Sequence, residues 1–291
     1  LMQDLRLLIH QMSPLLGEVE INAREMRRRI AGSVHGDLLA FPELALTGYS
    51  LRSRAPRFAW NGGVGQPLEL PPGSPPTALT VPELGSDQLV YNTALLLHGD
   101  RILARHRKVY LPTYGPFEEG RFFAPGRRSP RVAELPCGWR VGLLVCEDFW
   151  HPALVYLLAM QGADLVLVLS AAPGRGEPGE GPGAPGPLFS STASWSLLAR
   201  SAALQHGLFV AVANRTGVEE GLTFAGGSLV AGPDGEIVAQ APQGDEAVLE
   251  VVLPRDALRR ARTPFAHLRD EDPGYLRRAL GHLAYGKEDP H

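Results

Sequence analysis

Val141-Gly-Leu-Leu-Val-Cys-Glu-Asp-Phe-Trp150 is an apolar run that ends at a cysteine, with two carboxylates directly behind it. Such a short run predicts a buried strand, and the helical pattern that starts at His151 is followed by another apolar run over residues 164–169. Strand, helix and strand in this order are typical of a parallel βαβ unit. A side chain at the end of such a strand is rigidly held, and the N-terminus of the next helix favours a thiolate. We therefore interpret Cys146 as the candidate nucleophile of an α/β enzyme.

Further strand and helix patterns along the chain fit one α/β domain in which some strands are antiparallel. The predicted strands are 5–9, 37–41, 90–97, 101–107, 140–145, 164–169, 208–213, 229–231, 237–240 and 248–253, and the predicted helices are 18–34, 151–161 and 193–206. Ile21, Met26 and Ile30 form the apolar side of the first helix. We expect mostly loop over 50–82 and 111–128, one domain over 1–255, and an Arg-rich helical arm over 256–291.

Composition argues against several classes of protein. The formal net charge of −3 offers no basic field for nucleic acid, and no apolar stretch approaches the ~18 residues of a membrane span. The N-terminal residues lack a signal-peptide pattern, so we expect a cytoplasmic protein whose two cysteines, Cys137 and Cys146, are free thiols. The nine histidines form no metal-ligand pair, and we expect no metal and no cofactor.

Two other segments carry candidate catalytic groups. In Phe41-Pro-Glu-Leu-Ala-Leu-Thr-Gly-Tyr49, the carboxylate of Glu43 stands at the end of a buried strand and can act as a base. Lys108 follows the predicted strand 101–107, and the only other lysine of the chain is Lys287. A lysine in so arginine-rich a chain indicates a position where a compact ammonium fits and a planar guanidinium does not.

A base, a cation and a thiol at three strand ends are suited to acyl transfer. Glu43 would take the thiol proton and Cys146 would attack the carbonyl carbon of an amide. Lys108, together with a backbone N–H near the cysteine, would stabilise the tetrahedral oxyanion. A Cys-His thiol hydrolase that uses His151 is the weaker alternative at this point.

These three segments closely resemble the nitrilase, or carbon–nitrogen hydrolase, superfamily. The resemblance implies a four-layer α-β-β-α sandwich, a triad of Glu43, Lys108 and Cys146, and a homodimer or larger homo-oligomer. It also implies a second glutamate that orients the site. Glu119, in Glu119-Gly-Arg-Phe-Phe123, matches this position best, and Glu118 is the second choice.

Within the superfamily, the motifs look most like the glutaminase domain of glutamine-dependent NAD synthetase. That likeness implies a glutamine pocket built by Tyr49, Tyr114, Phe117, Glu147, Trp150 and Ser170. Arg175 is a candidate for binding a substrate carboxylate, and it lies within a Gly/Pro-rich insert over 173–187. The aromatic residues also fit plain packing, and Glu147 and Asp148 also fit charges that answer a helix dipole.

Three functions stay open on the sequence alone. The leading one is an amidase that acts on glutamine or another small amide and releases ammonia. Because the chain has no ATP-binding loop of the Ser-Gly-Gly-x-Asp-Ser type, the second is a glutaminase subunit that supplies ammonia to a separate NAD synthetase. The third is a binding or scaffold protein that keeps the triad without turnover.

Overall fold

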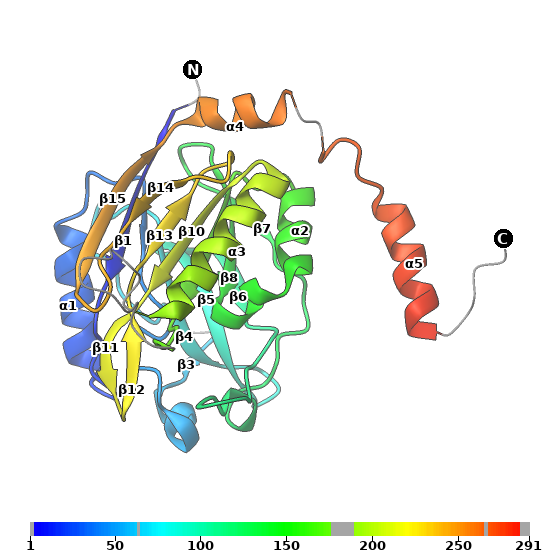
Figure 1. The fold of residues 1–291 in the computed structure, drawn as a ribbon. Coiled ribbons are helices and arrows are strands. Elements are labelled where there is room, and N and C mark those ends of the chain that lie inside the picture. Colours follow the sequence, from blue (N-terminus) through cyan, green and yellow to red (C-terminus); the bar gives the residue numbers. More distant parts are fainter. Residues whose placement is uncertain (1–2, 63–64, 176–188, 265–266, 286–291) are drawn as a thin grey trace, which may run out of the picture.

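Two large β-sheets, packed face to face, form the centre of the molecule (Figure 1). The computed structural model describes residues 3–62, 65–175, 189–264 and 267–285. The first sheet has the strand order β15 (Ala247–Leu253), β1 (Leu5–Gln11), β2 (Leu38–Ala40), β4 (Thr77–Leu84), β5 (Val90–His98) and β6 (Arg101–Arg107), with β3 (Trp60–Asn61) paired to β4. Strands β1, β2 and β4 are parallel, whereas β15, β5 and β6 run antiparallel to their neighbours.

The second sheet contains the predicted βαβ unit. Its strand order is β14 (Ile237–Gln240), β13 (Leu229–Ala231), β10 (Phe209–Asn214), β9 (Leu165–Ser170), β8 (Arg140–Val145) and β7 (Val132–Glu134). Strands β8, β9 and β10 are parallel, as the connections through helices require. A separate two-stranded ribbon is formed by β11 (Thr216–Glu219) and β12 (Leu222–Ala225).

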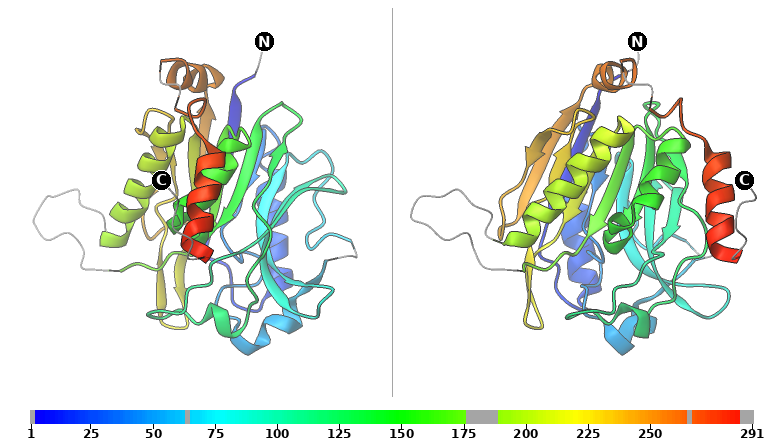
Figure 2. Two further views of the ribbon diagram at one scale, coloured as in Figure 1. Left: turned by 90° about the vertical axis from the view of Figure 1, so that its right-hand side faces the viewer. Right: turned by 45° about the vertical axis from the view of Figure 1, so that its right-hand side comes forward.

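Helices cover the outer face of each sheet. Met26 and Ile30 of α1 (Val19–Ala31) pack with Leu8 on the outside of the first sheet. Leu158 of α2 (Pro152–Met160) and Ala199 of α3 (Ser190–His206) pack on the second sheet. Leu5, Leu7 and Ile9 of β1 point the other way, into the core between the sheets, because strand side chains alternate in direction. The predicted four-layer α-β-β-α sandwich is confirmed (Figure 2).

The C-terminal residues form two helices. Helix α4 (Arg255–Arg262) follows β15 directly, and α5 (Pro273–Tyr285) stands apart from the two sheets at the red end of the chain (Figure 1). The proposed domain boundary at residue 255 stays a prediction. No helix among the described residues is long and apolar enough to span a membrane.

Two local expectations were wrong. Ile21 is 45% exposed, so the buried side of α1 keeps the predicted Met26 and Ile30 and is completed by Asn22 and Ala23. Residues 50–82 are also less irregular than expected, because β4 begins at Thr77 and a short 3-10 helix, η1, spans Arg52–Phe58. Pro82 concealed the strand, since proline is rare inside sheets. Residues 176–188 of the Gly/Pro-rich insert lie outside the described residues.

Candidate active site

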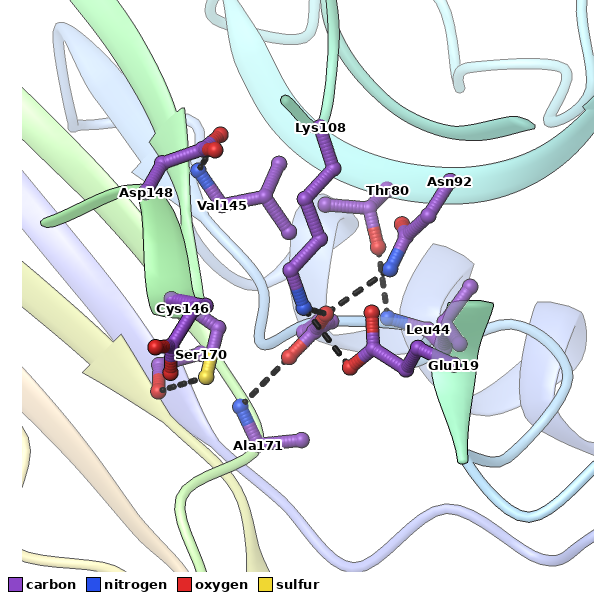
Figure 3. A network of polar contacts seen from close by, with 12 residues as sticks. Leu44, Thr80, Asn92, Lys108, Glu119, Val145, Cys146, Asp148, Ser170 and Ala171 are labelled. Atoms are coloured by element: carbon purple, nitrogen blue, oxygen red, sulfur yellow. Dashed lines mark hydrogen bonds and ion pairs between the residues drawn. The ribbon is translucent and has the colours of Figure 1, made fainter. Parts of the chain in front are cut away.

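The predicted catalytic side chains stand just beyond strand ends of both sheets. Lys108 follows β6 and Glu43 follows β2 in the first sheet, whereas Cys146 follows β8 in the second. Ser170, the last residue of β9, lies beside Cys146 (Figure 3). Because the two sheets pack against each other, groups far apart in sequence converge at one end of the sandwich.

Lys108 connects two carboxylates at the centre of this site. Its ammonium nitrogen Nζ donates to Oε1 of Glu43 at 2.8 Å and to Oε1 of Glu119 at 2.7 Å (Figure 3). The side chain is 0% exposed. Burial by itself lowers the pKa of Lys108, but the charges of Glu119 and Glu43 outweigh it and hold this pKa well above its ordinary value. Lys108 is therefore a charged ammonium at neutral pH.

The carboxylate of Glu43 is held on both of its oxygens. Oε1 also accepts a hydrogen bond from the amide of Asn92 at 2.7 Å, and Oε2 accepts from the backbone N–H of Ala171 at 3.0 Å. The next residue, Leu44, has a φ of 52°, and its N–H donates to the hydroxyl of Thr80 at 2.6 Å. This tight turn places the carboxylate at the end of β2 with little freedom to move.

Cys146 occupies a strained turn between β8 and η3 (Cys146–Trp150), a short 3-10 helix. Its φ is 43°, a left-handed value that non-glycine residues rarely adopt, and Sγ accepts a hydrogen bond from Ser170 at 3.4 Å. Burial raises the pKa of the Cys146 thiol, and the negative charge of Glu43 raises it further. The expected thiolate stabilisation by a helix N-terminus is thus outweighed, and the resting group is a thiol.

The choice between the two adjacent glutamates is decided by their surroundings. Glu119 is buried and accepts hydrogen bonds from Lys108 and, at 2.5 Å, from the hydroxyl of Tyr49. Burial raises its pKa to about 7. Glu118 instead forms an exposed ion pair with Arg121 at 2.6 Å. Glu119, and not Glu118, is therefore the glutamate that contacts Lys108.

A pocket of about 390 Å³ opens beside the thiol. It is lined by Tyr114, Phe117, Cys146, Glu147, Trp150, Ala172, Pro173, Arg175, Ser191, Ser194 and Trp195. The hydroxyl of Tyr114 donates to Glu147 at 2.7 Å. The guanidinium of Arg175 lies 4.9 Å from the ring centroid of Phe117. The pocket thus presents one carboxylate and one guanidinium between aromatic walls.

Most of the predicted substrate-binding residues line this pocket, but two do not. Tyr49 contacts Glu119, and Ser170 contacts Cys146, so both support predicted catalytic groups. Ser191, Ser194 and Trp195 of α3 were missed, because their helix lies beyond the insert and carries no motif of its own. Asn92 was also missed, although a lone amide inside an apolar strand was a signal.

His151 contacts Tyr110 and Glu147, which are not the partners that a catalytic Cys-His pair requires. Its ring stacks on Tyr110 with centroids 3.3 Å apart, and Nε2 lies 4.0 Å from the carboxylate of Glu147. The carboxylates around Lys108 are therefore the better candidates for the base of the site.

The family model for carbon-nitrogen hydrolases matches residues 9–263 of this chain. The chain belongs to the carbon-nitrogen hydrolase family. It is 29% identical over 88% of its length to the glutamine-dependent NAD(+) synthetase of Thermotoga maritima, of which it covers 43%. It is 28% identical over 82% of its length to a nitrilase of Pyrococcus abyssi, of which it covers 85%.

Solved structures agree with this assignment. An amidase from Nesterenkonia sp. superimposes with a TM-score of 0.75 at 27% identity, covering 95% of this chain and 96% of the amidase. The protein is thus a carbon–nitrogen hydrolase enzyme, and the predicted likeness to the NAD synthetase glutaminase domain is confirmed. The chain spans less than half the length of the NAD synthetases that it matches.

Proposed function

We propose that this carbon–nitrogen hydrolase cleaves the side-chain amide of glutamine, or of a similar small amide, and releases ammonia. The observation that carries the proposal is the contact of one buried ammonium, Lys108, with two carboxylates, Glu43 and Glu119, beside a pocket that Cys146 lines. A mutant of the Nesterenkonia amidase shows covalent addition of the acetamide moiety of fluoroacetamide at its active-site cysteine. That adduct supports Cys146 as the nucleophile here.

Acylation begins from a neutral thiol. Because the pKa of Cys146 is raised, the proton has to leave as the carbon–sulfur bond forms, and Glu43 accepts it. The amide oxygen becomes an oxyanion, which the ammonium of Lys108 and a backbone N–H near Cys146 stabilise. The intermediate then collapses: the carbon–nitrogen bond breaks, the nitrogen takes the proton from Glu43, and ammonia leaves a thioester on Cys146.

Deacylation uses the same groups in reverse. Glu43 accepts a proton from water as its oxygen attacks the thioester carbon. The carbon–sulfur bond breaks, and the departing sulfur takes that proton, which restores the thiol and the carboxylate. The product is the carboxylic acid of the substrate. Glu119 keeps Lys108 oriented in both halves of the reaction.

The charges in the pocket favour an α-amino acid that carries a side-chain amide over an uncharged amide. The carboxylate of Glu147 can bind a substrate ammonium group, and the guanidinium of Arg175 can bind a carboxylate. Tyr114, Phe117 and Trp150 offer apolar walls for the methylene groups between them. Glutamine carries both charges and a terminal amide.

A screen of ammonia release from glutamine, asparagine, acetamide and propionamide tests this function. Cys146→Ser should abolish turnover, whereas Cys137→Ser, at the other cysteine of the chain, should leave it unchanged. Arg175→Met should raise KM for glutamine by tenfold or more, on the order of one lost charged hydrogen bond, and leave KM for propionamide unchanged. Wild-type enzyme that hydrolyses no amide would refute the proposal.

A second proposal follows from the similarity to NAD synthetases: the ammonia is handed to a separate NAD synthetase. Co-purification with such a synthetase, and NAD formation by the mixture at the expense of glutamine, are the expected results. If free synthetase neither accelerates glutamine hydrolysis nor uses the ammonia that is released, this second proposal is contradicted.

The homo-oligomer and the cytoplasmic location stay predictions. Light scattering at several protein concentrations tests the homo-oligomer.

A further inference from the structure

Asp148 is a fully buried carboxylate that is absent from the lining of the substrate pocket. Its Oδ1 accepts hydrogen bonds from the backbone N–H groups of Val109 at 2.9 Å and Tyr110 at 3.0 Å. Its Oδ2 accepts from the N–H of Val145 at 3.3 Å and lies 2.8 Å from Nε2 of His106. One side chain therefore meets four hydrogen-bonding groups.

The partners of Asp148 belong to the two segments that carry the catalytic groups. Val109 and Tyr110 directly follow Lys108, and His106 precedes it by two residues on β6. Val145 directly precedes Cys146 at the end of β8 (Figure 3). Strands β6 and β8 lie in different sheets, so this carboxylate joins the lysine segment of one sheet to the cysteine turn of the other.

A carboxylate fits this set of neighbours on both of its oxygens. All three backbone groups are donors, and a carboxylate is the side chain that accepts without donating. An asparagine in the same place would turn its NH₂ group toward one of these backbone N–H groups. Two donors would then face each other, and the buried N–H would lose its acceptor, which is costly. The turn that Asp148 supports also contains the left-handed backbone of Cys146, a conformation that persists only where the surroundings enforce it.

We propose that Asp148 is a positioning residue, which sets the ammonium of Lys108 relative to the thiol of Cys146, and that His106 holds the Asp148 carboxylate in this task. The inference rests on the proposed amide hydrolysis. It assigns no contact with substrate to either residue. Because a misplacement of ~1 Å in a reacting group can cost about a hundredfold in rate, the main effect of losing this link is on kcat.

The test compares two reactions of the same thiol. Amide hydrolysis needs the oxyanion contact of Lys108, whereas alkylation of Cys146 by iodoacetamide forms no oxyanion. Asp148→Asn should lower kcat by about a hundredfold, leave KM within about threefold, and slow alkylation much less. Asp164→Asn is the matched control, because Asp164 is buried beside the start of β9 and pairs with Arg255 and Arg262. It should lower stability and leave kcat unchanged.

A second pair of variants separates positioning from folding. His106→Gln keeps a donor for Asp148, and His106→Leu removes it, so kcat should be near wild type in the first and at least about tenfold lower in the second. The inference is overturned if Asp148→Asn loses hydrolysis and alkylation equally, both in proportion to the fraction of protein that remains folded. It is also overturned if Asp148→Asn folds and keeps full activity. If wild-type enzyme hydrolyses no amide, the proposed function fails instead. A crystal structure of Asp148→Asn with Lys108 and Cys146 unmoved would then reject the positioning role as well.

Discussion

The hydroxyl of Tyr49 donates a hydrogen bond of 2.5 Å to Oε1 of Glu119. The same oxygen accepts from Lys108, so the tyrosine and the ammonium share one acceptor in the interior. The bond from Tyr49 lowers the pKa of Glu119 against the larger effect of burial. Tyr49 therefore acts on the charge state of the site and stands outside the residues that line the pocket.

Tyr49→Phe should lower kcat/KM for the best amide by roughly tenfold to a hundredfold, the range for a hydrogen bond to a charged group. In the dependence of rate on pH, a midpoint that reflects the ionisation of Glu119 should also move to higher pH, since a contact that favours the ionised carboxylate is lost. Rates measured from pH 5 to 9 check both expectations. Tyr156→Phe is the control, because the hydroxyl of Tyr156 bonds Glu271 at the surface. An unshifted profile in Tyr49→Phe would argue against this role.

Removal of the central cation should destabilise the fold. Lys108→Met leaves the buried carboxylates of Glu43 and Glu119 facing each other without a counter-charge, and we expect a loss of about 3 to 5 kcal/mol in the free energy of unfolding. The double variant Lys108→Met with Glu119→Gln should recover part of this stability and none of the activity. Urea unfolding and ammonia release are the measurements. A double variant no more stable than Lys108→Met would show that the repulsion is unimportant.

The raised pKa of Glu119 predicts that the free energy of unfolding falls as the pH rises. Its pKa in the folded protein, about 7, is raised above the ordinary 4.5, so the folded state binds this proton more tightly than the unfolded state. Its contribution to the free energy of unfolding is complete below about pH 4.5 and falls as the pH rises to about 7. Wild-type protein should therefore lose more stability between pH 5 and pH 8 than Glu119→Gln. Glu118→Gln, at the exposed neighbour, should behave as wild type.

The strand end that carries Lys108 is also fixed by a close backbone approach. The N–H of Gly126 donates to the carbonyl of Lys108 at 2.7 Å, and a Cβ at Gly126 would lie 2.2 Å from the carbonyl oxygen of Arg107. Gly126→Ala should lower the free energy of unfolding by about 1 to 3 kcal/mol and reduce kcat, because the backbone at Lys108 has to shift. Gly281→Ala in α5 has open space around the new methyl group and should be neutral or stabilising. Thermal melting and ammonia release test the pair.

Much of the candidate site was predictable because its information is local in the chain. Glu43, Lys108 and Cys146 each follow an apolar strand pattern, and each stands in a short motif that resembles the family. The strand order of the βαβ unit was predictable for the same reason, since apolar runs and helix periodicity depend on neighbouring residues. Strand β4 was not, because Pro82 interrupts the pattern on which such a prediction depends.

The sequence by itself determined which chemical groups this enzyme has at its strand ends, and thereby its family. Tertiary structure alone decided the charge states of these groups and the neighbouring residues that hold them in place. The raised pKa of Cys146, the choice of Glu119 over Glu118 and the link made by Asp148 all depend on groups that meet only when the two sheets pack. Glu43 and Lys108 are 65 positions apart in the chain yet 2.8 Å apart in space. Desolvation and Coulomb interactions depend on that packing, so no local pattern of residues encodes them.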